Sequence, residues 1–326
     1  MILVTGGAGF IGSNIVVDLC EQGLPVTVCD RLRDNDKWRN IAKSNVADVV
    51  SPDELFAWLE GRQRLEAVVH MGAISSTTVK DADLMFAVNV TLSTRLWHWC
   101  ATHRTPFIYA SSAATYGAGE HGFDDDDRLE ALLKLRPLNA YGWSKCYFDR
   151  RVAMWVERKE PAPPQWVGLK FFNVYGPNEY HKGTMQSVVA QKFPMAAADE
   201  PITLFKSYDP RYPDGGQLRD FVYVRDCAKV VSWLLGQRQV SGIFNLGTGQ
   251  ARSFEDVARA IAAALGKPLR IEYIPMPEAI RPNYQYYTQA RMERLRRCGY
   301  EAPFTTLEDG VREYVTQYLA SADRYR

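Results

Sequence analysis

Short apolar runs recur along the first half of the chain, and helical or polar stretches separate them. Each run has the length of a buried strand, and together they occupy residues 2–4, 25–29, 66–71, 106–110 and 167–172. Between the first two runs, Ile11, Ile15 and Leu19 recur at intervals of four residues, which predicts a helix. Two more helices are predicted over residues 52–60 and 82–103. Strands alternating with helices predict an α/β fold with a doubly wound parallel sheet, whose ligands bind at the carboxyl ends of the strands.

Three glycines follow the first apolar run at intervals of three residues, directly before the predicted helix. In such a strand–turn–helix setting, Gly6 permits the turn and Gly9 lets the backbone approach a pyrophosphate. Gly12 lets the helix pack closely on the sheet, with its positive end towards the phosphates. The pattern therefore predicts a Rossmann-type dinucleotide site.

The second half of the chain has a different sequence pattern, because its predicted elements are shorter and many prolines interrupt them. We expect residues 1–173 to form the Rossmann domain. Residues 174–218 and 248–326 are expected to form a smaller C-terminal α+β substrate-binding lobe. Apolar segments at 220–224 and 242–246 predict that residues 219–247 return to the first domain. Residues 208–217 and the acidic run 124–127 are predicted to be surface loops, the acidic run simply solvated.

The second predicted strand ends on Asp30, which is followed at once by basic residues. An acid at this position normally accepts hydrogen bonds from the adenosine ribose, which favours NAD. Arg31 and Lys37 are cations that can instead hold a 2′-phosphate, which favours NADP. We expect NADP, with NAD as the alternative.

Composition excludes several classes of function. The 39 Lys and Arg residues balance 38 Asp and Glu residues, so the net charge of +1 predicts no nucleic-acid partner. No apolar run approaches the roughly 20 residues that a bilayer requires, so no membrane association is expected. The six cysteines lack a metal-type spacing and, with no leader before the first strand, are expected to be reduced thiols in the cytoplasm. No metal is expected in the chemistry.

The strongest chemical signal is Tyr141 with Lys145, four residues later. On a helix this spacing places both side chains on one face. A tyrosine has an ordinary pKa of about 10, and a neighbouring ammonium favours its phenolate. Ser112 ends the strand before, where its hydroxyl can bond the oxygen that exchanges a proton; Ser111 and Thr115 compete for this role, and all three are also plausible helix caps. A serine, a tyrosine and a lysine together exchange a proton on a hydroxyl while a nicotinamide exchanges hydride.

These residues together resemble the extended short-chain dehydrogenase/reductase family over essentially the whole chain. Later segments narrow the resemblance to nucleotide-sugar epimerases, and specifically to the ADP-L-glycero-D-manno-heptose 6-epimerases; they occupy residues 171–177, 179–185, 219–224, 244–249 and 284–289. The resemblance implies that ADP-heptose is epimerised at its exocyclic C6″ during synthesis of the lipopolysaccharide core. It also implies a homo-oligomer, a pentamer, with an ADP-sugar as its small-molecule partner.

The resemblance also assigns residues to roles. It implies Tyr141 and Lys182 as the two acid/base groups, Lys145 as the lysine that supports the tyrosine, and Ser112 as the serine. The cofactor surface comprises Gly6, Gly9, Phe10, Ile11, Gly12, Asp30, Arg31, Lys37, Met71, Gly72, Ala73, Ser75, Asn89, Lys145, Val174 and Lys182. The substrate residues are Asn173, Thr184, Gln191, Phe205, Arg219 and Tyr284.

Two of these assignments have alternatives. Lys182 can instead contact a phosphate or cap its loop. The planar guanidinium of Arg219 suits a diphosphate. The alternative is that Arg219 only forms a structural salt bridge to Asp220. The segment 208–218 is longer than the family pattern, and Pro52 replaces a lysine that usually contacts the cofactor.

Epimerisation at an unactivated carbon explains why a dinucleotide is needed. The C–H bond is too weakly acidic for a base alone, whereas transient oxidation makes the carbon planar and return of hydride to the other face inverts it. The cofactor is then regenerated in each cycle and is expected to stay tightly bound. The sugar must rotate between the half reactions, so its oxygen meets a second proton-transfer group.

Other functions remain as alternatives at this point. One is another nucleotide-sugar epimerase or dehydratase of this fold, such as a UDP-hexose 4-epimerase; the stretch 112–114 lacks the acid pair of dehydratases. The other is an NADP-binding regulator without turnover, against which the retained pair of Tyr141 and Lys145 argues.

Overall fold

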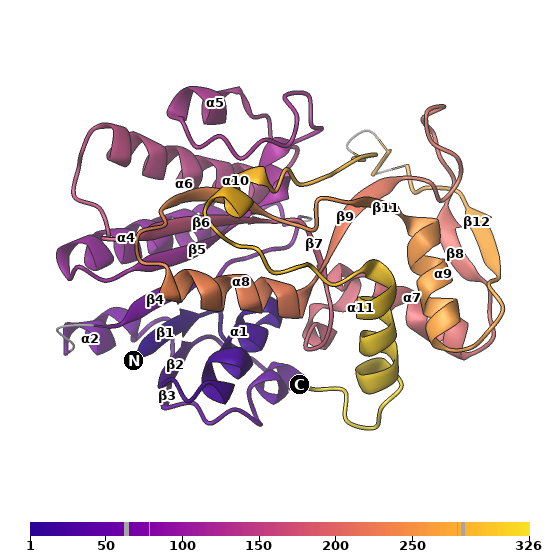
Figure 1. The fold of residues 1–326 in the computed structure, drawn as a ribbon, viewed down its shortest axis with the longest axis horizontal. Coiled ribbons are helices and arrows are strands. Elements are labelled where there is room, and N and C mark those ends of the chain that lie inside the picture. Colours follow the sequence, from indigo (N-terminus) through magenta and orange to yellow (C-terminus); the bar gives the residue numbers. More distant parts are fainter. Residues whose placement is uncertain (62–64, 78, 279, 282–283) are drawn as a thin grey trace.

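A seven-stranded parallel sheet forms the centre of the larger lobe (Figure 1). The computed structural model describes residues 1–61, 65–77, 79–278, 280–281 and 284–326. The strand order is β10-β6-β5-β4-β1-β2-β3, and every neighbouring pair is parallel. The strands are β1 (Ile2–Thr5), β2 (Val26–Cys29), β3 (Asp48–Val50), β4 (Ala67–His70), β5 (Phe107–Ser112), β6 (Trp166–Phe171) and β10 (Gly242–Leu246). The predicted doubly wound α/β fold is confirmed.

Alternate residues of each strand pack against helices on opposite faces of this sheet. Val4 and Ile108 join a core with residues of α1 (Phe10–Glu21) and α8 (Val224–Gly236). Leu3 and Phe107 join a second core with residues of α2 (Leu55–Glu60), α4 (Leu92–Thr102) and α6 (Ala140–Glu157). Burial on both faces explains why these strands are continuously apolar in the sequence.

Two predicted helices differ in detail from the observed ones. The helix predicted over 52–60 begins only at Leu55, because residues 51–54 form a turn in which the amide of Glu54 donates to Ser51. The stretch 82–103 is helical but contains a π-helical turn, since α3 (Ala82–Phe86) and η2 (Ala87–Thr91) precede α4. Shorter elements of this lobe are η1 (Asp36–Asn40), η3 (Ala113–Tyr116) and α5 (Leu129–Lys134).

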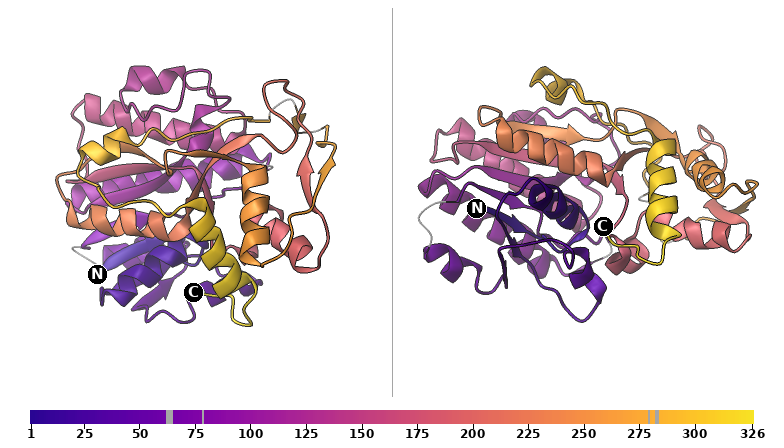
Figure 2. Two further views of the ribbon diagram at one scale, coloured as in Figure 1. Left: turned by 45° about the vertical axis from the view of Figure 1, so that its right-hand side comes forward. Right: turned by 60° about the horizontal axis from the view of Figure 1, so that its bottom comes forward.

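The second lobe lies beside the carboxyl edge of the large sheet and has its own core (Figures 1 and 2). Its three-stranded sheet has the order β11-β9-β7, and β12 pairs with β8 in parallel. The strands are β7 (Asn173–Tyr175), β8 (Ile202–Phe205), β9 (Leu218–Tyr223), β11 (Ala251–Ser253) and β12 (Ile271–Ile274). The helical elements of the second half, besides α8, are η4 (Tyr180–Met185), α7 (Val188–Ala197), α9 (Phe254–Ala264), α10 (Glu293–Arg297), α11 (Leu307–Glu313) and η6 (Tyr314–Leu319).

Residues 219–247 connect the two lobes. β9 belongs to the three-stranded sheet of the second lobe, whereas α8 packs against α1 and β10 forms an edge of the large sheet. The chain therefore returns to the first lobe at α8, a few residues later than the sequence predicts.

The acidic run 124–127 is not simply solvated, and this prediction is wrong. Asp125 accepts a hydrogen bond from the amide of Asn245 (2.9 Å), and Asp127 accepts one from the amide of Ile243 (3.2 Å). Asp127 also pairs with Arg294 (2.5 Å). These carboxylates satisfy backbone amides on the outer side of β10, which an edge strand would otherwise leave unpaired.

The C-terminal tail, residues 321–326, crosses back to the first lobe, where the C-terminus lies in both views of Figure 2. Arg326 pairs with Asp18 of α1, and Lys43 pairs with Asp323 (2.6 Å) and donates to the carbonyl of Tyr325 (2.6 Å). Tyr180 of η4 donates to the carbonyl of Arg324 (2.6 Å). The tail therefore joins η4 to the segment that follows η1.

Candidate active site

The turn between β1 and α1 has the geometry that a dinucleotide clamp requires. Gly6 adopts a φ of 66°, and a Cβ at this position would lie 2.6 Å from the backbone nitrogen of Gly72. A Cβ at Gly12 would overlap the carbonyl oxygen of Gly6. Gly9 caps α1 without a side chain, so the first amides of the helix are available to a phosphate. The residues present therefore fit a bound dinucleotide.

Asp30 lies next to this turn and is part of a charged group. Its carboxylate accepts hydrogen bonds from the amide of Ala8 (2.9 Å) and from the ammonium of Lys37 (2.5 Å). Both Asp30 and Lys37 line the cavity described below. Arg31 points elsewhere, because its guanidinium makes a two-pronged pair with Asp53 (2.8 and 2.6 Å) at the surface.

The loop after β4 forms another side of the site. Met71, Gly72, Ala73 and Ser75 all line the cavity. Asn89 of η2 does not line it, although the sequence places this residue on the cofactor surface. Its buried side chain accepts from the amide of Ile74 (2.8 Å) and donates to the carbonyl of the same residue (3.0 Å). Asn89 thus holds the loop that lines the cavity.

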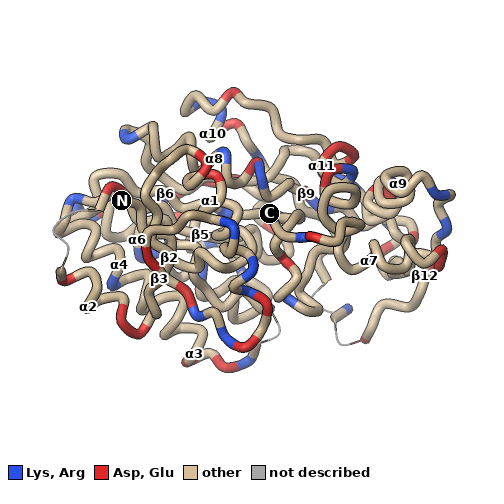
Figure 3. Tube along the Cα trace, turned by 90° about the horizontal axis from the view of Figure 1, so that it is seen from below, with Lys and Arg blue, Asp and Glu red and all other residues tan. Residues whose placement is uncertain are grey.

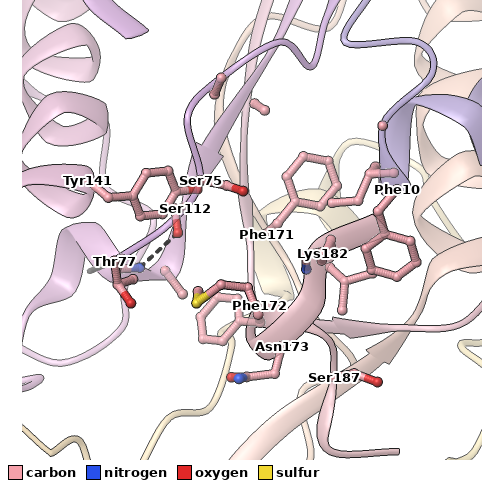
Figure 4. A pocket seen from close by; sticks show the side chains of 18 of the residues that line it. Phe10, Ser75, Thr77, Ser112, Tyr141, Phe171, Phe172, Asn173, Lys182 and Ser187 are labelled. Carbon is pink, nitrogen blue, oxygen red and sulfur yellow. Dashed lines mark hydrogen bonds between the residues drawn. The ribbon is translucent and has the colours of Figure 1, made fainter. Parts of the chain in front are cut away.

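One cavity of about 610 Å³ lies at the carboxyl ends of the strands and collects most of the predicted residues. Besides the glycine turn, its walls include Ser112, Tyr141, Lys145, Asn173, Val174, Lys182 and Thr184. Figure 4 shows Tyr141 and Ser112 close together on one side, with Lys182 and Phe10 across from them. The cavity therefore brings together most of the residues that the sequence assigns to the cofactor and to catalysis.

Tyr141 and Lys145 lie one turn apart in α6, and Ser112 ends β5 beside them. Ser112 and Tyr141 lie close together at the cavity wall (Figure 4), and the Oγ of Ser112 accepts a hydrogen bond from the amide of Ala114 (3.1 Å). Ser112 thus lies at the cavity beside Tyr141 and also caps η3. The competing hydroxyls are engaged elsewhere, since Ser111 donates to Asp149 (2.7 Å) and Thr115 donates to the carbonyl of Ser112 (2.8 Å).

Burial sets the protonation of these groups. It raises the pKa of Tyr141, an effect that the neighbouring Ser112 hydroxyl partly offsets. It also lowers the pKa of Lys145 to about 8, against the opposing effect of Asp149. Both shifts favour uncharged side chains. A further positive charge beside Tyr141 is therefore needed to bring its phenolate into working range.

Lys182 belongs to the short helical segment η4 on the opposite wall. Its ammonium lies 5.0 Å from the centre of the Phe10 ring, and burial lowers its pKa while Glu179 counteracts this. Glu179 holds η4 in place, because its buried carboxylate accepts hydrogen bonds from the hydroxyls of Ser187 (2.6 Å) and Tyr314 (3.1 Å). Lys182 is thus held at the cavity by a fixed segment, and it is placed to accept or donate a proton.

The predicted substrate residues fall into two groups. Asn173 and Thr184 line the cavity, and Gln191 supports Thr184 by donating to its carbonyl (3.2 Å). Arg219, Tyr284 and Phe205 lie outside the lining, in the second lobe. The Arg219 guanidinium lies 5.3 Å from the centre of the Tyr284 ring.

Arg219 does not form the alternative salt bridge with Asp220. Asp220 instead accepts hydrogen bonds from the amides of Thr248 (2.7 Å), Gly249 (2.9 Å) and Ala290 (3.0 Å). Arg219 donates to the carbonyls of Leu218 (2.9 Å) and Gln285. Its charge is therefore not neutralised by its neighbour, and it is held beside an aromatic ring.

The long segment 208–218 covers this second group. Tyr212 stacks on Tyr286 at 5.6 Å, and the amide of Tyr208 donates to the hydroxyl of Tyr286 (3.2 Å). The segment therefore packs on the strip of chain that carries Tyr284.

Several polar residues that line the cavity were not assigned to the site from the sequence. Among them are Thr77, His181 and Gln285. His181 lies 3.2 Å from the Asn40 amide nitrogen, and burial lowers its pKa to about 4, so it is neutral. The sequence position of His181 next to Lys182 could have indicated that it lines the cavity. Gln285 reaches the cavity through a contact between the lobes, in which its side chain donates to the carbonyl of Gly117 (2.5 Å), and the sequence does not show this contact.

Comparison with known proteins decides the family. Residues 2–247 match the NAD dependent epimerase/dehydratase family. The chain belongs to this family. A relative from Fusobacterium nucleatum subsp. nucleatum, named ADP-L-glycero-D-manno-heptose-6-epimerase, is 46% identical over the full length of both chains. The resemblance to these epimerases, and the assignment to the isomerases, are therefore confirmed.

Solved structures agree with this assignment. The chain is similar to the Helicobacter pylori ADP-L-glycero-D-manno-heptose-6-epimerase, with a TM-score of 0.80, 29% identity and coverage of 97% of this chain and 95% of that one. It is also similar to a Thermus thermophilus UDP-glucose 4-epimerase in complex with NAD, with a TM-score of 0.71, 29% identity and coverage of 96% and 97%. A nicotinamide dinucleotide is thus the cofactor type of this fold, and the cavity has the features to hold it.

Charge and hydropathy add two observations. Figure 3 shows acidic and basic residues interspersed along the chain. Within the described residues, no helix is long and apolar enough to cross a membrane, and no cluster of three or more His, Cys, Asp or Glu residues could hold a metal ion.

Proposed function

We propose that the protein interconverts ADP-D-glycero-β-D-manno-heptose and ADP-L-glycero-β-D-manno-heptose by transient oxidation at C6″. The observation that carries the proposal is the placement of two proton-transfer groups, Tyr141 and Lys182, on opposite walls of one cavity (Figure 4). A sugar whose carbon is first oxidised and then reduced on its other face presents its oxygen in two poses. Two separate groups on facing walls suit this requirement, which a simple dehydrogenase does not have.

The first proton transfer is assigned to Tyr141. Its phenol lies close to Ser112 at the cavity wall (Figure 4), and Ser112 is positioned to hold the same substrate oxygen. Lys145 follows one turn later and supplies a positive charge to the same cavity wall. When bound, a nicotinamide dinucleotide would take up and return the hydride and would add positive charge near Tyr141. This charge favours the phenolate, which burial alone disfavours.

The second proton transfer is assigned to Lys182. Burial lowers its pKa, which brings an amine closer to the range in which it can exchange protons near neutrality. Glu179 and its partners keep η4 in place, so the amine stays at the cavity wall. The alternative role, contact with a phosphate, makes a different prediction, because loss of Lys182 would then weaken cofactor binding first.

We further propose NADP as the tightly bound, recycled cofactor. Lys37 is a cation that already lies at the ribose-binding acid Asp30, as recognition of a 2′-phosphate requires. Arg31 would have to exchange its contact with Asp53 for the phosphate to take part. NAD is the alternative, since Asp30 itself suits a free 2′-hydroxyl.

The ADP part of the substrate is assigned to the second lobe. Arg219 carries an unneutralised guanidinium suited to a diphosphate, and Tyr284 lies against it. A homo-oligomer, a pentamer by resemblance, is also part of the proposal.

The function is tested by NMR of ADP-D-glycero-heptose with the purified protein and no added cofactor. We expect the exocyclic centre to invert, and a deuterium label at C6″ to stay in the inverted sugar, because the same hydrogen is taken up and returned. Loss of the label to solvent with none retained would contradict the oxidation scheme. Turnover of UDP-hexoses but not of the ADP-heptose would favour the alternative epimerase.

A further inference from the structure

The helix that carries Tyr141 and Lys145 carries a third polar residue on the same face. Asp149 follows Lys145 by four residues, as Lys145 follows Tyr141. Residues at this spacing lie above one another on a helix. Asp149 is completely buried, so it does not serve solubility or surface pairing.

Asp149 binds three side chains that come from β5 and β6, two neighbouring strands of the large sheet. On β5, Tyr109 donates to it at 3.1 Å and Ser111 donates to it at 2.7 Å. On β6, Lys170 donates to it at 3.0 Å and is itself completely buried. Lys170 also donates to Thr115 of η3 at 2.7 Å. A buried ion pair costs desolvation and is a weak source of stability, so its presence here calls for another explanation.

We propose that Asp149 is a positioning residue for the epimerase chemistry: it fixes the rotation of α6 against β5, so that Tyr141 meets Ser112 and Lys145 keeps its charge. The inference rests on the proposed function. Ser111 immediately precedes Ser112, and its bond to Asp149 ties the serine-bearing strand to the tyrosine-bearing helix. Lys170 and Thr115 extend the tie to the turn after Ser112.

The network also places a negative charge behind the pair of Tyr141 and Lys145. The groups that face Asp149 are Tyr109 from β5, Lys170 from β6 and Lys145 from its own helix; Tyr116 of η3 faces Lys170, 4.8 Å from its ammonium. The Asp149 charge opposes the effect of burial on Lys145, whose pKa is about 8, and it raises the pKa of Tyr141. Removing that charge should therefore lower both pKa values, whereas a purely structural residue would leave them in place.

The test compares pH profiles of kcat for wild type, Asp149→Asn and the double variant Asp149→Asn/Lys170→Met. The double variant removes both buried charges and avoids leaving Lys170 uncompensated, which is the main risk to folding. We expect kcat to fall about tenfold or more, and the alkaline limb of the profile to move to lower pH by about one unit. The KM for the ADP-sugar and the content of bound dinucleotide should change little.

Tyr109→Phe is the matched control, because it removes one hydrogen bond to Asp149 but leaves the charge. We expect its alkaline limb to coincide with that of wild type. If neither charge-removing variant folds, Asp149→Glu keeps the charge and displaces it; we then expect a lower kcat with both limbs unmoved, and limbs that move would overturn the proposal.

Two outcomes separate this inference from the proposed function. Wild-type protein that does not invert the ADP-heptose would refute the proposed function itself. Wild-type inversion together with a folded charge-removing variant, Asp149→Asn or the double variant, whose alkaline limb stays in place would refute only the positioning role, whatever the rate of that variant.

Discussion

The ammonium of Lys182 lies 5.0 Å from the centre of the Phe10 ring, so the first residue of α1 touches the proposed second acid/base group. The aromatic face can stabilise the cation, which opposes the burial that lowers the pKa of Lys182. In the proposed complex, α1 therefore has two roles. Its first amides bind the dinucleotide, and its first side chain, Phe10, contacts Lys182. The cofactor clamp and the substrate side of the cavity meet at this residue.

Lys182→Met should cripple epimerisation while leaving the dinucleotide bound. The reason is that the proposed mechanism has Lys182 exchange a proton with the sugar, and loss of such a group typically costs about 10²–10⁴-fold in rate. The measurement is kcat by NMR of the sugar, with bound cofactor quantified after denaturation. Lys192→Met is the control, since this partly buried lysine bonds Thr203 and does not line the cavity. A variant that lost cofactor but bound sugar normally would show that Lys182 is a cofactor residue.

Tyr141→Phe should remove nearly all turnover, again by about 10²–10⁴-fold, because the proposed mechanism assigns the first proton transfer to the Tyr141 phenol, which lies beside Ser112 at the cavity wall (Figure 4). The fold and the bound dinucleotide should be retained, as judged by thermal unfolding and absorbance. Tyr147→Phe lies on the same helix but faces Phe86, and it should behave as wild type. A wild-type rate in Tyr141→Phe would remove this residue from the mechanism.

The rate of the wild-type enzyme should fall on the alkaline side at about pH 8, where Lys145 loses its proton. The sign follows from the cause: burial lowers the pKa of Lys145 from its usual value, so the ammonium that supports the Tyr141 phenolate is lost earlier than in an exposed lysine. The profile of kcat/KM against pH measures this limb. A limb that appears only near the ordinary lysine pKa, at about 10, would contradict the assignment.

Arg31→Ala/Lys37→Ala should shift cofactor preference from NADP towards NAD by roughly tenfold or more, because each charge-assisted hydrogen bond contributes about 1.5–3 kcal/mol. Mass analysis of the cofactor released from native protein, together with titration of apoprotein with each dinucleotide, measures the preference. Arg128→Ala alters an exposed pair with Asp126 far along the chain and should change nothing. NAD as the native cofactor would refute the role given to these two cations.

The parts of the site that local sequence encodes were predictable, and the parts that depend on distant contacts were not. The turn at Gly6 and the pair of Tyr141 and Lys145 follow from spacing alone, because a turn and one helix face are local properties. Asp149 has the same helical spacing, yet the role proposed for it depends on its ion pair with Lys170 of β6. No pattern near Asp149 indicates that partner.

The same distinction explains the two differences on the surface of the first lobe. The acidic run 124–127 looks solvated because its partners, the edge strand β10 and Arg294, are more than a hundred residues away. In the sequence, Arg31 is available to bind a phosphate. In the structure it pairs with Asp53, which lies in the turn before α2 and is not adjacent to it in the sequence. Charge pairing between distant segments decides both cases, and sequence alone does not reveal it.

The C-terminal tail gives a physical basis for the proposed retention of the dinucleotide through repeated turnovers. It contacts Lys43, which follows the segment of Lys37, and Tyr180, which begins the segment of Lys182. Lys37 and Lys182 both line the cavity. Spreading these two segments apart to release the dinucleotide would therefore also break the tail's contacts. We expect exchange with dinucleotide in solution to be slow, as suits a catalyst that needs no fresh oxidant.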